Sequence, residues 1–145
     1  MRKIRGIAGA VPILVAGLLF PAPAQAGERF AVELSDTQNF QDLPGTFTSN
    51  IPGCPTGESF TLRGMVQLQS GVFRGTRMFV CDSGIGSVTA NLSARFGEDG
   101  SVGTWSLVGG SGAFSGVHGA GKLVGTPVTD GIRDDYTGTV TVTGT

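Results

Sequence analysis

Residues 88–96 read Val-Thr-Ala-Asn-Leu-Ser-Ala-Arg-Phe, and apolar and polar side chains alternate without a break along them. A repeat of two puts one set of side chains on each side of an extended strand, so one face is dry and the other is wet. Residues 136–143 near the end of the chain repeat the pattern, with threonine at every second position. Valine and threonine are favoured on pleated surfaces. Both stretches therefore predict half-buried β-strands.

Working outward from residues 88–96, we expect further strands at residues 29–34, 59–69, 72–81, 102–108 and 120–124. The short segments between several of these runs contain the Gly and Asp that tight hairpins favour: 70–71, 82–86 and 98–101. Residues 43–58 are rich in Pro and Gly, and we expect one long irregular loop there.

The number and spacing of the strands limit the fold. Roughly seven to nine strands, about ten residues apart, suggest a β-sandwich or a β-barrel. Glycine interrupts many of the strands, and such glycines mark the bulges and bends that close a barrel. We therefore predict an all-β, closed antiparallel barrel with minimal helix, at most one short turn near residues 112–117.

The first residues of the chain have the features of an export signal. Arg2, Lys3 and Arg5 precede an uncharged apolar run at residues 6–20, and Ala24-Gln25-Ala26 is a small-x-small cleavage pattern. The apolar run is shorter than the roughly 20 residues that span a bilayer, although an uncleaved anchor is the alternative. We expect a cleaved signal peptide at residues 1–26, a single domain at residues 27–145 and a secreted protein.

Removal of the signal changes the charge of the chain. The whole sequence has 10 Lys and Arg against 11 Asp and Glu, and three of the basic residues lie in the signal, so seven against eleven leaves about −4. An anionic domain disfavours nucleic acid and anionic membrane as partners. One His and two Cys exclude most zinc sites. We expect no metal and no cofactor.

Cys54 and Cys81 are the only cysteines, and both follow the expected signal. In an exported chain the default expectation is a disulfide between them. The alternative is a reactive thiol, which would need a nearby base, and the only imidazole is His118.

Residues 109–114 read Gly-Gly-Ser-Gly-Ala-Phe, and Ser115-Gly116-Val117 follows as a compact turn. The segment resembles the Gly-Gly-Thr-Gly-x-Phe segment of the dirigent and allene oxide cyclase barrels, with Ser111 in place of the usual Thr. This resemblance implies an eight-stranded antiparallel barrel of the calycin kind. It carries over no catalytic residue, because the acids, Arg and Tyr of dirigent proteins cannot be aligned with this chain.

Three side chains are candidates for binding a ligand inside such a barrel: Arg77, Trp105 and Tyr136. Arg77 shares a face with Phe79 and Cys81 if the alternation holds, and an inward Arg needs an acid or an anionic ligand. The simpler interpretation is that the register slips by one residue, which would turn Arg77 outward. Trp105 and Tyr136 would be core or pocket wall.

Other polar residues have weaker claims. His118 is better explained as an exposed turn residue than as a general base. Asp134 and Asp135 are adjacent, so they point to opposite faces and cannot share one proton, although one of them can face the barrel mouth near Tyr136. A calcium site formed by these two and Asp130 lacks the usual loop spacing.

Small residues on the expected dry face, such as Ala90 and Ala94, suggest unfilled volume in the barrel. The sequence therefore suggests binding of a small apolar or aromatic molecule, and the sharper version is a cofactor-free, dirigent- or cyclase-like isomerase. The alternative is an exported, solid-cored interaction or cell-surface protein with no catalytic activity. A hydrolase with His118 as base is a third hypothesis. The oligomeric state is left open.

Overall fold

The computed structural model describes residues 27–41, 43–67 and 69–142. The expected signal peptide at residues 1–26 lies outside the described residues.

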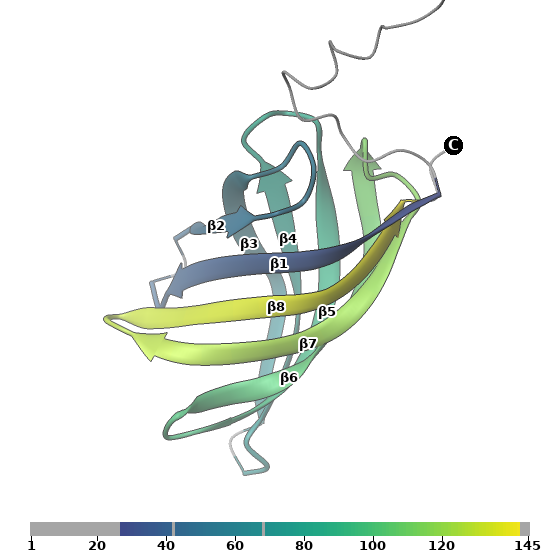
Figure 1. Ribbon diagram of the computed structural model, residues 1–145. Coiled ribbons are helices and arrows are strands. Elements are labelled where there is room, and N and C mark those ends of the chain that lie inside the picture. Colours follow the sequence, from purple (N-terminus) through teal and green to yellow (C-terminus); the bar gives the residue numbers. More distant parts are fainter. Residues whose placement is uncertain (1–26, 42, 68, 143–145) are drawn as a thin grey trace, which may run out of the picture.

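The described chain forms a closed barrel of eight antiparallel strands (Figure 1). Each strand is hydrogen-bonded to its neighbours in the sequence, and β8 is hydrogen-bonded to β1. The barrel prediction is confirmed, and the described residues contain no helix. The strands are β1 (Glu28–Asn39), β2 (Gly45–Ser49), β3 (Thr56–Gln67), β4 (Val72–Cys81), β5 (Gly86–Gly97), β6 (Gly100–Gly112), β7 (Val117–Val128) and β8 (Gly131–Val142).

The alternation predicted for residues 88–96 is present in β5 from Val88 to Ala94, but Phe96, expected on the dry face, is 39% exposed. Its side chains at Val88, Ala90, Leu92 and Ala94 are buried in the lumen, whereas the residues between them face outward. Two interruptions adjust the register: one between Thr61 and Arg63 on β3, and one between Thr89 and Ala90 where β5 pairs with β6. Such bulges increase local twist and help a sheet to close.

The expected loop at residues 43–58 was wrong in part, because it contains β2 and the start of β3. The Pro and Gly residues hid a strand of only five residues, Gly45–Ser49. β2 pairs with β1 as far as Thr37, and with β3 between Thr56 and Ser59. Beyond these points β1 and β3 run on without β2 between them, which leaves a gap in the wall of the barrel.

The Cys54–Cys81 disulfide predicted from the sequence is formed, with 5.2 Å between the Cα atoms. It ties the loop before β3 to the end of β4. Closing a loop of this length restricts the unfolded chain and stabilises the fold by about 3 kcal/mol. A structural disulfide is typical of an oxidising compartment.

We call the end of the barrel that carries the Cys54–Cys81 disulfide the disulfide end. The opposite end, where β1 ends and β8 begins, is called the polar end.

Candidate functional site

Near the polar end of the barrel, strands β1, β3, β4 and β8 place polar side chains in the lumen. On β1 the inward positions continue from Val32 and Leu34 to Asp36 and then Gln38, because every second residue faces the same way. β3 contributes Ser59 and Thr61, β4 contributes Arg77, and β8 contributes Asp134. Asp36 and Ser59 are fully buried, and Arg77 and Asp134 are 3% and 6% exposed. We call these six residues the polar cluster.

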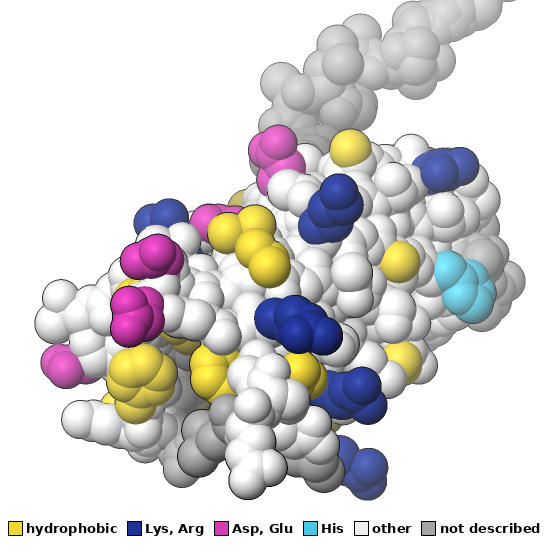
Figure 2. All heavy atoms as spheres, turned by 90° about the horizontal axis from the view of Figure 1, so that it is seen from below, with side chains coloured by type: hydrophobic (Ala, Val, Ile, Leu, Met, Phe, Trp, Pro, Cys, Tyr) yellow, Lys and Arg dark blue, Asp and Glu magenta, His cyan; other side chains and the backbone are white. Residues whose placement is uncertain are grey.

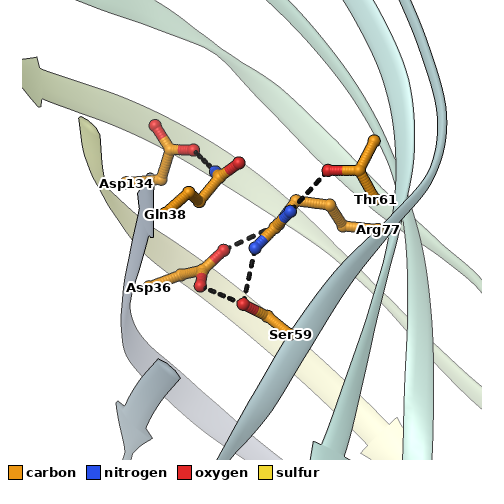
Figure 3. Close-up of polar contacts among 6 residues, drawn as sticks. All are labelled: Asp36, Gln38, Ser59, Thr61, Arg77 and Asp134. Carbon is orange, nitrogen blue, oxygen red and sulfur yellow. Dashed lines mark hydrogen bonds and ion pairs between the residues drawn. The ribbon is translucent and has the colours of Figure 1, made fainter. Parts of the chain in front are cut away.

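Arg77 organises the polar cluster (Figure 3). Its Nε donates to Asp36 Oδ2 at 2.7 Å, its Nη2 donates to Ser59 Oγ, and Ser59 Oγ donates to Asp36 Oδ1. Nη1 donates to Thr61 Oγ1 at 2.6 Å. Burial of an ion pair costs desolvation energy that further hydrogen bonds offset, and Ser59 makes one such bond with each partner.

Gly45, at the start of β2, makes room for this arrangement. A Cβ at Gly45 would lie 2.5 Å from Ser59 Oγ, 2.7 Å from the Thr37 carbonyl oxygen and 3.0 Å from Arg77 Nη2. Any larger side chain would therefore push Ser59 and Arg77 apart. Gly45 made β2 look like a loop in the sequence, and in the structure its lack of a side chain is what allows Ser59 and Arg77 to pack beside it.

Asp134 has a different environment from Asp36. It accepts a hydrogen bond from Gln38 Nε2 at 2.6 Å, and no cation lies within ion-pair distance of it among the described residues. Burial, and then the negative charge of Asp36, raise the pKa of Asp134 from 3.8 to about 6, although Arg77 opposes the shift. Near neutral pH the cluster therefore holds two carboxylates and one guanidinium.

A layer of aromatic rings separates the polar cluster from the rest of the lumen. Phe47, Phe79, Tyr136 and Trp105 meet edge to face in that order, with centroids 5.5, 5.5 and 6.4 Å apart. The Arg77 guanidinium lies 6.0 Å from the Phe79 ring centroid. The Tyr136 hydroxyl is buried and has no hydrogen-bond partner among the described residues. Its pKa is raised well above the ordinary value by burial and then by the negative charges of Asp134 and Asp36.

The lumen on the disulfide side of this layer is almost filled. It retains an apolar cavity of about 30 Å³, lined by side chains that include Val88, Ala90 and Tyr136. The sequence suggested unfilled volume in the lumen, but little is left, because large side chains pack against the positions where neighbouring strands have small residues. A Cβ on Gly138 would lie 2.7 Å from the Trp105 indole, whose Nε1 donates to the carbonyl oxygens of Lys122 and Thr137.

The polar end has a larger opening. Where β2 is missing between β1 and β3, a pocket of about 220 Å³ lies in the wall of the barrel. We call it the mouth pocket, and it is lined by Gln38, Asn39, Leu43, Pro44, Phe60, Thr61 and Arg77. One side of it is apolar, and the other offers amide, hydroxyl and guanidinium groups. Arg77 is therefore both part of the buried ion pair and part of an open site.

The structure places all three candidate ligand-binding residues inside the barrel but does not bring them to one site. Arg77 points inward, so the simpler interpretation of a slipped register was wrong. Trp105 and Tyr136 line the small apolar cavity instead of the mouth pocket. Asp134 faces the lumen and Asp135 faces outward, where it pairs with Arg133 at 3.3 Å.

His118 is exposed, as expected, but it lies on the outer side of β7 and not in a turn. Among the residues that the structure describes, no three His, Cys, Asp or Glu side chains gather closely enough to hold a metal ion. The described chain has no helix with the length and apolar character needed to cross a membrane.

The sequence analysis missed Asp36, Gln38, Ser59 and Thr61. The signal for the first two was present: the alternation through Val32 and Leu34 continues to Asp36 and Gln38, but we expected the strand to end at Leu34. Ser59 and Thr61 carried no signal, because nothing local distinguishes a buried serine or threonine from one on the surface.

Comparison with known proteins adds no relative to this picture. No protein-family model matches the chain, no curated protein matches it, and no solved structure matches it.

Proposed function

We propose that this protein is a secreted barrel that binds a small molecule, about the size of one substituted ring, in the mouth pocket. The observation that carries this proposal is the position of Arg77, which is 3% exposed yet lines an open pocket of about 220 Å³. A cavity of about 150 Å³ is enough to hold benzene, and ligand sites combine apolar walls with a few fixed polar groups.

The hydrogen bonds of Arg77 indicate which ligand group the pocket prefers. A guanidinium has five N–H donors. Asp36, Ser59 and Thr61 accept three of them, which leaves one N–H on each terminal nitrogen without an acceptor among the described residues. A free N–H on each terminal nitrogen can donate to an oxygen acceptor such as a carbonyl.

The charge of the polar cluster favours a neutral ligand over an anion. Asp36 already balances Arg77, and ionised Asp134 adds a negative charge nearby. We therefore expect an aromatic carbonyl compound to bind better than the corresponding carboxylate near neutral pH. Protonation of Asp134 below about pH 6 should reduce that difference.

A cofactor-free isomerase, as the resemblance to the dirigent and allene oxide cyclase barrels implies, would use the same pocket. Its support is that fixed N–H donors stabilise negative charge developing on a carbonyl oxygen. The small apolar cavity gives no support to a reaction in the disulfide side of the lumen, because about 30 Å³ holds no more than a water molecule or two.

The alternative is a solid-cored interaction protein without catalytic activity. The nearly filled lumen favours it, as do the apolar side chains exposed beside the mouth pocket, with Phe40 76% and Leu43 60% exposed. The two functions differ in what occupies the pocket: a small molecule in the first, and the surface of a partner in the second.

A titration with three matched probes tests the proposal: acetophenone, ethylbenzene and benzoate, followed by amide chemical shifts. We expect acetophenone to bind most tightly near neutral pH and to shift Gln38, Asn39 and Thr61. Leu43→Trp, which fills the mouth pocket, should abolish these shifts. Val108→Trp, at another exposed apolar position, should leave them unchanged.

Two results would overturn the proposal. One is the absence of saturable shifts with any probe up to its solubility limit. The other is a set of shifts that surrounds the apolar cavity, at Phe30, Ile51 and Phe114, and persists in Leu43→Trp. Equal binding of acetophenone and ethylbenzene would retain the pocket but reject the role assigned to Arg77.

A further inference from the structure

The charged side chains are unevenly distributed around the barrel. Strands β4, β5, β6 and β7 contain no Asp or Glu, whereas β1, β3 and β8 hold all of the acidic residues that lie in strands. In Figure 2 most acidic side chains of the visible face lie toward the left, and most Lys and Arg side chains lie to the right of them as separate patches on a largely neutral surface. The acidic residues between these strands, Asp82, Glu98 and Asp99, lie in the turns at the ends of the barrel. An overall negative charge therefore conceals a region of positive charge along the strands themselves.

Three arginines and one lysine form this region, which we call the basic face: Arg63, Arg74, Arg95 and Lys122. Arg63 on β3 pairs with Thr76 on β4, and Arg74 lies on the same strand two residues before Thr76. Arg74 in turn pairs with Ser93 on β5, and Arg95 lies two residues beyond it. Each step is a diagonal across neighbouring strands, for which side chains are roughly 7–8 Å apart.

Lys122 extends the same face. Ser93 pairs with Thr104 on β6, and Thr104 pairs with Lys122 on β7. Lys122 therefore stands in the same row as Arg74, three strands away, at about 14 Å for strands spaced roughly 4.8 Å apart. Arg63, Arg74 and Arg95 therefore follow one diagonal, and Lys122 lies to the side of Arg74. Together the four cations extend far enough to contact several units of an extended polymer.

The arginines of the basic face are exposed, and they form no ion pair with any residue that the structure describes. The two ion pairs found in the described part of the chain involve Arg77 and Arg133, and none involves Arg63, Arg74 or Arg95. Shallow hollows flank Arg74: one of about 650 Å³ contains Arg63 with Gly64 and Gly75 at its floor. The other, of about 310 Å³, reaches Arg95 past Ser93 and Thr104.

The surface between the cations indicates the kind of anion. Its side chains include the hydroxyls and amide of Thr76, Asn91 and Ser93, with Val72 and Val102 beside Arg95. The one exposed aromatic residue of β4, β5 and β6 is Phe96, which follows Arg95 near the end of β5 and is 39% exposed. Single-stranded nucleic acids depend on stacking of successive bases against several aromatic side chains, and a single ring at one end of this face does not supply such a series. Hydroxyls and amides instead match a polymer rich in hydroxyl groups.

We propose that the basic face binds an acidic polysaccharide, a chain of sugars that carry carboxylate or sulfate groups. The cations contact the anionic groups, and the hydroxyl and amide side chains between them bond to the sugar hydroxyls. The acidic residues on the remaining strands repel polyanions there, so binding of the polysaccharide is confined to the basic face. This site lies on the outer wall of the barrel and does not depend on the mouth pocket.

The test measures binding of alginate to the intact protein by calorimetry at low and at physiological salt. We expect binding that weakens steeply as salt rises, because the contacts are between exposed charges. Arg74→Ser/Arg95→Ser should weaken it at least tenfold. The matched control is Arg29→Ser/Arg133→Ser, which removes the same charge from exposed positions on β1 and β8 and should change the affinity less than twofold.

Four outcomes would overturn the inference. The first is no binding of alginate at low salt. The second is an equal loss in both double variants, which would mean that only net charge matters. The third is equal binding of neutral dextran, and the fourth is tighter binding of polyglutamate or single-stranded DNA than of alginate. Binding of acetophenone to Arg74→Ser/Arg95→Ser is measured as well. It tests the mouth pocket independently, so a failure of the polysaccharide proposal can be told apart from a failure of the proposed function.

Discussion

The two halves of the lumen differ in what fills them and in how the filling is stabilised. On the disulfide side, interlocking rings and aliphatic side chains leave about 30 Å³ empty, and the disulfide closes the end. On the polar side, Asp36 and Arg77 are buried together and depend on hydrogen bonds from their neighbours. Apolar packing is stabilising in itself, whereas a buried ion pair often contributes little or nothing compared with apolar residues of the same volume.

That difference suggests that the polar cluster is present for a purpose other than stability. A network that costs desolvation energy, and that lies beside an opening in the wall, is the arrangement expected of a binding site. Three substitutions test the comparison, from the largest expected effect to the smallest.

Arg77→Met should destabilise the protein by about 3–5 kcal/mol at neutral pH, because it leaves the Asp36 carboxylate buried without its partner. The double variant Arg77→Met/Asp36→Leu should recover most of this loss, since no buried charge remains. Urea unfolding of the two variants measures both effects. A double variant as unstable as Arg77→Met would show that the ion pair itself stabilises the fold.

Asp134→Asn should stabilise the protein above pH 6 and leave it unchanged below about pH 4. The folded state raises the pKa of Asp134 from 3.8 to about 6, so protonation is favoured by folding, and this stability is lost as the pH rises through about 6. A shift of about two units corresponds to about 3 kcal/mol. We expect about 2 kcal/mol, because the asparagine accepts a weaker hydrogen bond from Gln38.

Urea unfolding at about pH 4 and pH 8, for the wild type and Asp134→Asn, measures this dependence. Asp135→Asn is the matched control, because Asp135 points outward from the same strand and should show little effect. A wild-type protein that is more stable at pH 8 than at pH 4 relative to Asp134→Asn would contradict the assigned sign.

Val88→Ile should stabilise the disulfide side by up to about 0.8 kcal/mol, the value of one buried methylene, because Val88 lines the remaining apolar cavity. Val108→Ile, at an exposed position, should have no effect. Thermal unfolding compares the two. A loss of more than about 1 kcal/mol in Val88→Ile would indicate that this half is already packed to its limit.

Much of the architecture could be predicted because its signals are local. The alternation at residues 88–96 and the Asp-Gly at residues 99–100 determine a strand and the hairpin that follows it. Counting from Phe79 and Cys81 indicated an inward Arg77, but we preferred a register slip that would turn it outward, and this preference was wrong. The disulfide followed from there being two cysteines. β2 was missed because five residues between Pro and Gly carry too little periodicity.

The candidate site was less predictable, because its parts are far apart in the sequence. Asp36 and Arg77 are 41 residues apart, and Gln38 and Asp134 are 96 residues apart. Their contacts depend on strand register, which a single bulge on β3 shifts by one residue. The same holds for Trp105, which fills the space above Gly138 only because β6, β7 and β8 are neighbours.

The sequence by itself determined the β character of this protein, its principal turns and its disulfide, since each depends on residues close in the chain or on a unique pair. Tertiary structure alone decided that Asp36 and Ser59 would satisfy Arg77, that the lumen would be nearly filled, and that the exposed cations would stand together. Closure of a barrel fixes which distant residues face one another, and the energies of burial and charge depend on those neighbours.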